Sequence, residues 1–122
     1  LPSLIRDALQ KSKIRILINK NSTKDYISID DVIFLILKII KKGKKNLYNV
    51  ASGKNVKLID IARIIKKETG CSLIFKNQST KVLEPKINIQ RIKNEFKYMP
   101  RHNIQFIIRS MIKQFRNFYK HK

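Results

Sequence analysis

The sequence has 122 residues, and its 28 Lys and Arg against 8 Asp and Glu give a formal net charge of +20. This length sets a limit of one domain, residues 1–122, with a modest hydrophobic core. No apolar run is long enough to span a membrane, the first residues do not resemble a signal peptide, and the single cysteine, Cys71, excludes a disulfide framework. We therefore expect a reduced, cytoplasmic protein with no membrane contact.

The excess of positive charge has two interpretations. It is typical of proteins that bind nucleic acid or another polyanion. It is also typical of compositional drift, because Ile, Lys and Asn are abundant throughout and the basic residues are spread along the whole chain. We favour drift, and a small basic nucleic-acid-binding module stays open as the alternative.

The first part of the chain alternates helix and strand signals. Residues 1–11 predict a helix, with Pro2 in its first turn and one apolar stripe formed by Leu4, Ile5, Ala8 and Leu9. Residues 14–18, which are apolar except for Arg15, and the alternating residues 24–29 predict two strands. Turn-forming residues 19–23 join them, so the pair is expected to form a hairpin.

A strongly apolar segment follows. Asp30 and Asp31 favour a helix N-terminus, because carboxylates there accept backbone hydrogen bonds and complement the helix dipole. The residues after them predict a helix over 32–42 that ends at Gly43. Its apolar residues lie nearly all round the helix, which predicts burial on more than one side.

The central part predicts two strands around a helix. Residues 47–50 are expected to form a strand, residues 51–55 a turn, and a helix opens at Val56 or Lys57 and ends at Gly70. Residues 58–65 also resemble the first helix of a helix-turn-helix. A recognition helix should then follow at once, whereas residues 73–75 have β character, so we favour a strand there.

Two helices are predicted in the last third. Asn88 is expected to cap a helix over 89–96, and Asn103 to cap a longer one over 104–119. The complete prediction is a small mixed α/β unit of about five helices and four short strands.

Four motifs in this order resemble one enzyme family. Residues 24–32 resemble "R-D-Y-I-x-V-x-D-V" of the extended short-chain dehydrogenases/reductases, the nucleotide-sugar epimerases and dehydratases. Residues 47–53 resemble its "Y-N-V-G-S-G", residues 81–85 its "R-P-G-D-P", and residues 88–100 its "D-x-S-K-x-x-x-E-L-G-W-x-P". The resemblance covers nearly the whole chain but only the C-terminal third or so of such an enzyme.

The resemblance implies a function for the parent protein. This chain would be the substrate-binding portion of an NAD(P)-dependent isomerase or lyase that serves surface polysaccharide synthesis, without the Rossmann half that binds the cofactor. The absence of an initial Met fits a chain that begins partway through such a protein. Its partners would be a nucleotide sugar and the N-terminal Rossmann portion, with a homodimer as the parent's assembly.

The residues for hydride transfer are missing from this sequence. The family needs a glycine-rich turn for the cofactor pyrophosphate, and the three glycines here are scattered. It also needs a Tyr-x-x-x-Lys pair, and none of the tyrosines has a lysine at that offset. His102 and His121 have no ligand spacing with Asp, Glu or Cys. We expect no catalytic, cofactor-binding or metal-binding residue in this chain, so NAD or NADP belongs to the parent enzyme.

The functional residues that the resemblance does assign to this chain are contacts to the substrate. Lys24 and Lys81 take the places of two arginines that contact the nucleotide diphosphate, and the segment Arg15, Ile16 and Leu17 takes the place of one beside the nucleotide base. Lysine keeps the positive charge but loses the planar two-pronged donor. The alternative is that both lysines are ordinary solvated side chains.

The resemblance also predicts an exposed apolar surface. In the family, the helix corresponding to 32–42 and the strand corresponding to 47–50 complete the nucleotide-binding sheet, so a chain without that sheet should expose them. A third interpretation of the sequence is a decayed remnant of such a gene. Ile18 and Lys20, which stand where the family has two glycines, support it mildly.

Overall fold

The computed structural model describes residues 1–76 and 80–120. Within them the chain forms the predicted number of helices and strands, so the expected small α/β fold class is confirmed. The helices are α1 (Pro2–Lys11), α2 (Ile29–Lys42), α3 (Leu58–Thr69), α4 (Gln90–Phe96) and α5 (Ile104–Lys120). The strands are β1 (Lys13–Ile16), β2 (Thr23–Asp25), β3 (Asn55–Lys57) and β4 (Ser72–Phe75). None of the helices in these residues combines the length and hydropathy needed to cross a membrane.

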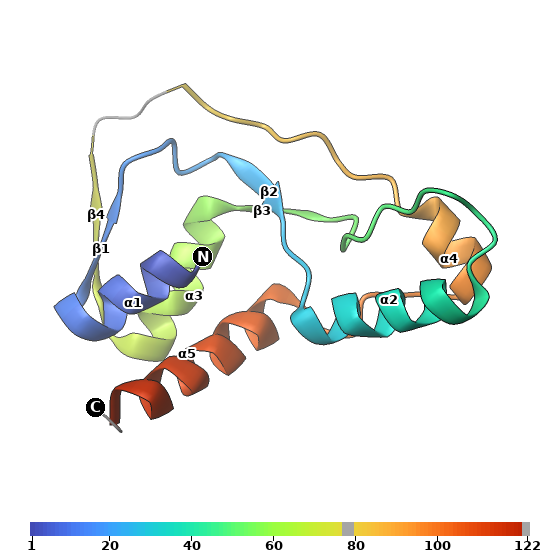
Figure 1. Cartoon of the computed structure of the whole chain (residues 1–122). Coiled ribbons are helices and arrows are strands. Elements are labelled where there is room, and N and C mark those ends of the chain that lie inside the picture. The colour runs from blue at the N-terminus through green and yellow to red at the C-terminus, as the bar shows by residue number, and fades with distance from the viewer. Residues whose placement is uncertain (77–79, 121–122) are drawn as a thin grey trace.

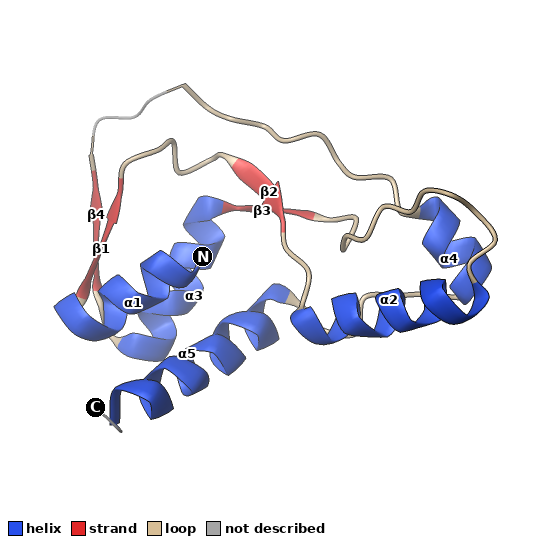
Figure 2. Cartoon of the chain, viewed as in Figure 1, coloured by secondary structure: helices blue, strands red, loops and turns tan. Residues whose placement is uncertain are grey.

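The molecule has two lobes, which are joined by β2, β3 and long connecting segments (Figures 1 and 2). The three-helix lobe consists of α1, α3 and α5 with β1 and β4, and the two-helix lobe consists of α2 and α4. Each lobe has its own hydrophobic core. The first core is built mainly from isoleucines of α1, β1, α3 and α5, and the second around Leu35, Ile92 and Tyr98.

The predicted hairpin between the first two strands is wrong. β1 instead pairs in parallel with β4, with Ile14 opposite Leu73, and β2 pairs antiparallel with β3. Ile14 and Ile16 are buried in the three-helix lobe, and β4 extends this apolar surface. The residues of β2 are Thr, Lys and Asp, which would bring no apolar side chain to that core.

The predicted strand over residues 47–50 does not form. Among the described residues no strand lies beside this segment, and a single extended segment without a ladder partner gains no sheet hydrogen bonds. Side chains hold its backbone instead, because Arg91 donates to the Leu47 carbonyl and the Asn49 amide donates to the Asn88 carbonyl at 2.9 Å. β3 (Asn55–Lys57) forms a few residues later, where the last residue of the predicted turn and the start of the predicted helix stand, because β2 pairs with it.

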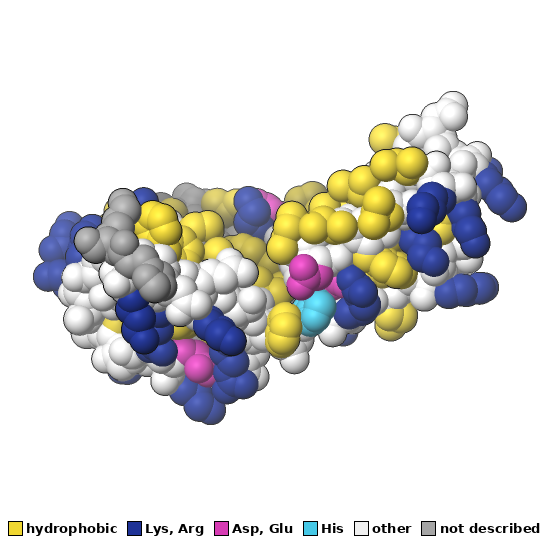
Figure 3. Space-filling view, turned by 60° about the horizontal axis from the view of Figure 1, so that its bottom comes forward, with side chains coloured by type: hydrophobic (Ala, Val, Ile, Leu, Met, Phe, Trp, Pro, Cys, Tyr) yellow, Lys and Arg dark blue, Asp and Glu magenta, His cyan; other side chains and the backbone are white. Residues whose placement is uncertain are grey.

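Helix α2 is covered on one side only. Its N-cap is Ser28, whose Oγ accepts a hydrogen bond from the Asp31 N–H at 3.1 Å. The helix therefore begins at Ile29, one residue before the two aspartates that are predicted to mark its N-terminus. Leu35 is fully buried, but five apolar residues on one face are 44% to 75% exposed: Ile29, Ile33, Ile36, Leu37 and Ile40. A space-filling view shows hydrophobic side chains gathered over the two-helix lobe (Figure 3). The expected exposed apolar surface is therefore present.

Of the predicted caps of the last two helices, Asn103 is confirmed, whereas the N-cap of α4 is Ile89 and Asn88 lies one residue before it. Asn88 Oδ1 accepts from the Gln90 N–H at 2.8 Å, and Asn103 Oδ1 accepts from the Phe106 N–H at 2.9 Å. The helix-turn-helix alternative is wrong, because α3 is followed by β4 rather than by a recognition helix.

Gly53 is expected to be less replaceable than Gly70. It has φ +74°, and a Cβ there would lie 2.8 Å from Ile89 in the core of the two-helix lobe. Gly70 has the same φ, but a Cβ there would meet nothing within 4 Å. We expect Gly53→Ala to lower the free energy of unfolding by about 3 kcal/mol and Gly70→Ala by about 1 kcal/mol. Urea unfolding measures both, and equal losses would contradict the role given to Ile89.

Candidate functional site

The fold brings the two predicted lysine segments side by side. Residues 82–84 run parallel to the start of β2, with a bridge between Thr23 and Leu83. The Thr23 N–H donates to the Val82 carbonyl at 3.0 Å, and the Glu84 N–H donates to the Thr23 carbonyl at 3.3 Å. Lys24 follows Thr23 and Lys81 precedes Val82, so the two lysines lie in neighbouring backbone segments, which together are called the strip.

Two polar side chains fix this strip in place. The buried Ser22 accepts from the Val82 N–H through its Oγ at 3.0 Å. From the other end, the Asn55 amide of β3 donates to the Glu84 carbonyl at 2.6 Å. The strip is thus held by β2 and β3 together. Asn55 was not found from the sequence, because an isolated asparagine in a turn carries no signal of a partner so distant in the chain.

The charge at the strip is partly neutralised. The Lys24 ammonium lies 3.3 Å from a carboxylate oxygen of Glu84, and both side chains are substantially exposed, at 60% and 42%. Lys81 is exposed and forms no ion pair within the described part of the chain. An anionic ligand at Lys24 would therefore have to displace Glu84, whereas Lys81 is available without such competition.

A cavity of about 200 Å³ lies beside Lys24 and Glu84, lined also by Ile18, Tyr26 and Val56. Burial raises the pKa of Tyr26, the Glu84 carboxylate adds to this, and the Lys24 charge opposes it. The Tyr26 hydroxyl therefore stays protonated at neutral pH and can act as a hydrogen-bond donor. The cavity is smaller than the 300–1,000 Å³ that is typical of complete ligand sites, so it suits one part of a larger ligand.

The three residues predicted to lie beside a nucleotide base occupy different environments. Ile16 is only 2% exposed, its side chain belongs to the core of the three-helix lobe, and its carbonyl accepts from the Lys76 N–H at 3.2 Å. Arg15 is exposed, and Leu17 is 61% exposed. Only Arg15 and Leu17 can therefore offer side chains to a ligand. The Ile16 side chain lies in the core instead.

Among the described residues, the ion pair with the most buried carboxylate involves Asp31. Its carboxylate is 1% exposed and accepts from Arg101 Nε at 2.7 Å and from the Arg101 N–H at 3.2 Å. Burial by itself would raise the pKa of Asp31, but hydrogen bonding to Arg101 and Ser28 outweighs it and holds this pKa below its ordinary value. Arg101 also donates to the Asp30 carbonyl at 2.9 Å, so it joins α2 to the segment before α5.

Ser28, His102 and Asp31 lie close together but do not form a catalytic triad. Ser28 Oγ and Asp31 Oδ2 lie 3.2 Å and 3.8 Å from the same histidine nitrogen, Nδ1. A triad needs the serine and the carboxylate on opposite nitrogens of the ring. Ser28 is also 6% exposed and already serves as the cap of α2, so the cluster is structural.

Tyr98 is buried against this cluster. Its hydroxyl has no hydrogen-bond partner among the described residues, and burial together with the Asp31 carboxylate raises its pKa to about 12. A buried phenol of this kind stays neutral at all physiological pH values. It packs in the core of the two-helix lobe and offers no proton-transfer group near neutral pH.

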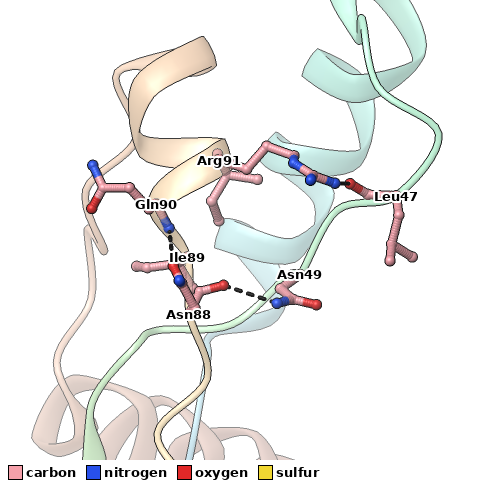
Figure 4. A pocket seen from close by; sticks show the side chains of 7 residues that line it. Leu47, Asn49, Asn88, Ile89, Gln90 and Arg91 are labelled. Carbon is pink, nitrogen blue, oxygen red and sulfur yellow. Dashed lines mark hydrogen bonds between the residues drawn. The ribbon is translucent and has the colours of Figure 1, made fainter.

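A cavity of about 350 Å³ lies between residues 47–49 and the start of α4 (Figure 4). Its polar side chains are engaged with backbone groups, because Asn49 and Arg91 donate to carbonyls and Asn88 Oδ1 accepts from the Gln90 N–H. The close-up shows these side chains bridging the two segments of the cavity wall (Figure 4). They hold residues 47–49 in place and leave no convergent set of free polar groups for catalysis.

Among the described residues there is neither a glycine turn of the kind that binds a dinucleotide pyrophosphate nor a cluster of metal-ligating side chains. Gly43 and Gly70 stand at the C-terminal ends of α2 and α3, and Gly53 precedes a strand, so none opens a helix after a strand as pyrophosphate binding requires. No group of three His, Cys, Asp or Glu side chains in residues 1–76 and 80–120 is placed to hold a metal. His121 lies outside the described residues.

No family model matches the sequence, and no curated protein is significantly similar to it. Solved structures do match. A NAD-dependent NDP-hexosamine 5,6-dehydratase, TunA, involved in tunicamycin biosynthesis, superposes with a TM-score of 0.84 at 15% identity, over 95% of this chain and 39% of that one. For dTDP-glucose 4,6-dehydratase from Bacillus anthracis in complex with NAD, the TM-score is 0.82 at 17% identity, over 95% and 38% of the two chains.

UDP-glucose 4-epimerase from Thermotoga maritima, solved with UDP-glucose, gives a TM-score of 0.82 at 16% identity, over 97% of this chain and 40% of that one. The chain thus spans about two fifths of the length of these enzymes. At such identities the match establishes the fold. The resemblance identified from the sequence is confirmed at this level: the chain has the fold of one part of an extended short-chain dehydrogenase/reductase of the nucleotide-sugar epimerase and dehydratase type.

Proposed function

We propose that this chain is the substrate-binding part of an NAD(P)-dependent nucleotide-sugar epimerase or dehydratase, in which Lys24 and Lys81 contact the nucleotide diphosphate. The observation that carries the proposal is the pairing of residues 82–84 with β2, which places two motifs far apart in the sequence on one strip. The fold match supports the same assignment, because the solved neighbours are named as enzymes that act on nucleotide-linked sugars.

Within this proposal the lysines act as electrostatic contacts. Lys81 provides a cation without an ion-pair partner among the described residues, and Lys24 provides a second cation when a diphosphate displaces the Glu84 carboxylate. The Tyr26 hydroxyl, kept protonated by burial, supplies a neutral donor from the adjoining cavity. Arg15 and Leu17 are the side chains from the third predicted segment that remain available to a nucleoside.

The cofactor and the chemistry belong to another part of the parent protein. NAD or NADP, when bound there, supplies the hydride acceptor and donor, and no residue described in this chain fits it. The parent is an isomerase or lyase of surface polysaccharide synthesis in the cytoplasm. The exposed face of α2 is the surface on which its cofactor-binding portion packs.

Calorimetric titration of the chain with UDP and dTDP tests the proposal. Lys24→Ala and Lys81→Ala are each expected to weaken binding about fivefold, which corresponds to about 1 kcal/mol for an exposed ion pair. Glu84→Gln is expected to strengthen binding, because it removes the carboxylate that competes for Lys24. Lys113→Ala, which removes an exposed lysine of α5, is the charge-matched control.

Two outcomes would contradict the proposal. Equal affinities for the Lys24, Lys81 and Lys113 variants would show that the strip does not hold the diphosphate. Tight binding of a random DNA duplex that falls steeply with salt, without preference for a nucleoside diphosphate, would favour the basic nucleic-acid-binding module instead.

A further inference from the structure

A second basic hollow lies between α3, β4 and the loop before β2. Its volume is about 550 Å³, within the range of complete ligand sites. Four cationic side chains line it, together with one carboxylate and an apolar wall. The cationic residues are Lys20, Lys57, Arg63 and Lys66, the carboxylate is Asp60, and the apolar residues are Ile59, Leu73 and Phe75.

The loop that carries Lys20 is fixed over the first turn of α3. The Ile59 N–H donates to the Lys20 carbonyl at 2.9 Å, and the Leu58 N–H donates to the Ser22 carbonyl at 2.9 Å. Within the loop, the Ser22 N–H donates to the Asn19 carbonyl at 2.9 Å. These bonds occupy the first two amides of α3, so any anion bound here would be held by side chains rather than by the helix N-terminus.

The charge in the hollow is largely uncompensated. Asp60 lies 3.7 Å from Arg63 and can neutralise that one cation. Lys20, Lys57 and Lys66 form no ion pair with any residue that the structure describes, in contrast to Lys24, which pairs with Glu84. A concave site lined by one sign of charge concentrates ions of the opposite sign.

The opposite wall of the hollow is apolar and partly aromatic. The Phe75 ring is 42% exposed, and the Lys20 ammonium lies 5.7 Å from its centroid. Leu73 continues the wall along β4. A ligand that matches both walls carries phosphate groups at one end and a flat or apolar body at the other. Lys20 also stands where the resembled family has a glycine, so this cation is a departure of this sequence.

The hollow is separate from the strip that contains Lys24. In the β2–β3 pair, Thr23 is opposite Lys57 and Lys24 is opposite Val56. Neighbouring positions on a strand point to opposite faces, so the Lys57 and Lys24 side chains leave this ribbon on opposite sides. A ligand held by Lys57 therefore differs in location from one held by Lys24.

We propose that this hollow is a second anion site, which binds a nucleoside polyphosphate through Lys20, Lys57 and Lys66, with its base against Phe75. The proposal does not depend on the function proposed for Lys24 and Lys81. It assigns a role to part of the positive charge that composition alone left unexplained.

Titration of the ¹⁵N-labelled chain with ADP, and separately with inorganic tripolyphosphate, tests it by NMR. Amide shifts are expected around residues 57–66 and 73–75. Lys57→Ala and Lys66→Ala should each weaken the binding of ADP and of tripolyphosphate about fivefold. Phe75→Ala should weaken ADP binding by at least fivefold, roughly the effect of losing one base–aromatic stack. The binding of tripolyphosphate should stay nearly unchanged.

The controls are Lys24→Ala, on the opposite face of the ribbon, and Lys113→Ala on α5; neither should alter the shifts in the hollow. Circular dichroism establishes that each variant is folded. The proposal is overturned if Lys57→Ala and Lys66→Ala bind as the controls do. It is also overturned if an RNA oligonucleotide shifts amide resonances over the whole surface while the shifts caused by ADP show no preference for the hollow.

Discussion

Arg101→Ala is expected to lower the free energy of unfolding by about 3 kcal/mol, because it leaves the Asp31 carboxylate buried without its partner. Asp31 is 1% exposed and receives two hydrogen bonds from Arg101, one of them from the backbone. The alanine variant keeps the backbone bond but loses the guanidinium and its contact with the Phe34 ring at 4.5 Å. Urea unfolding followed by circular dichroism measures the loss.

Arg109→Ala is the matched control. Its Nε lies 2.7 Å from Glu68, the same distance as in the Arg101 pair, but the Glu68 carboxylate is 22% exposed. We expect a loss of about 0.5 kcal/mol there, as for exposed ion pairs. Equal losses for Arg101→Ala and Arg109→Ala would show that burial of Asp31 has no energetic consequence.

The stability that the Asp31–Arg101 ion pair contributes should depend on pH in the acid range. The pKa of Asp31 is lower in the folded protein than its ordinary value of 3.8, so the folded state binds a proton less readily than the unfolded chain. The stabilisation is therefore complete above pH 3.8 and is lost as the pH falls through the lowered pKa. The difference in stability between the wild-type chain and Arg101→Ala should shrink over that acid range.

We expect the chain to self-associate through the uncovered face of α2, and Ile33→Glu together with Ile40→Glu should abolish most of this association. These side chains are 51% and 75% exposed on the uncovered face of α2. Burying each of them in an interface contributes about 1.5 to 3 kcal/mol, so their joint loss should lower the association constant at least about a hundredfold. Sedimentation velocity over a range of concentrations measures the effect, and the free energy of unfolding should change by less than about 0.5 kcal/mol.

The same chemical change elsewhere provides the control. Ile18 and Ile74 are 51% and 39% exposed but lie outside α2, so Ile18→Glu with Ile74→Glu should leave association unchanged. An association constant that falls equally in both double variants would show a general effect of charge rather than a docking face. A wild-type chain that stays monomeric at high concentration would contradict the proposal that this face of α2 is buried against another protein surface.

The two proposed anion sites illustrate what could be inferred from the sequence. The resemblance identified Lys24 and Lys81, and the fold places their segments side by side. Ser22 and Asn55, which hold the strip, could not be found, because their partners lie far away along the chain and neither stands in a distinctive motif. The hollow around Lys57 was also missed, because its cations were indistinguishable from the many scattered lysines.

The sequence by itself determined the approximate positions of the helices, several of their ends and the fold class. Helix periodicity, the Asn103 cap and the glycine stops act within a few residues, so local patterns were sufficient. Only the tertiary structure decided the pairing of β1 with β4, the loss of the strand at 47–50 and the burial of Asp31 against Arg101. Each of these depends on a partner distant in the chain, and the position of that partner is set by how the lobes pack rather than by any local pattern.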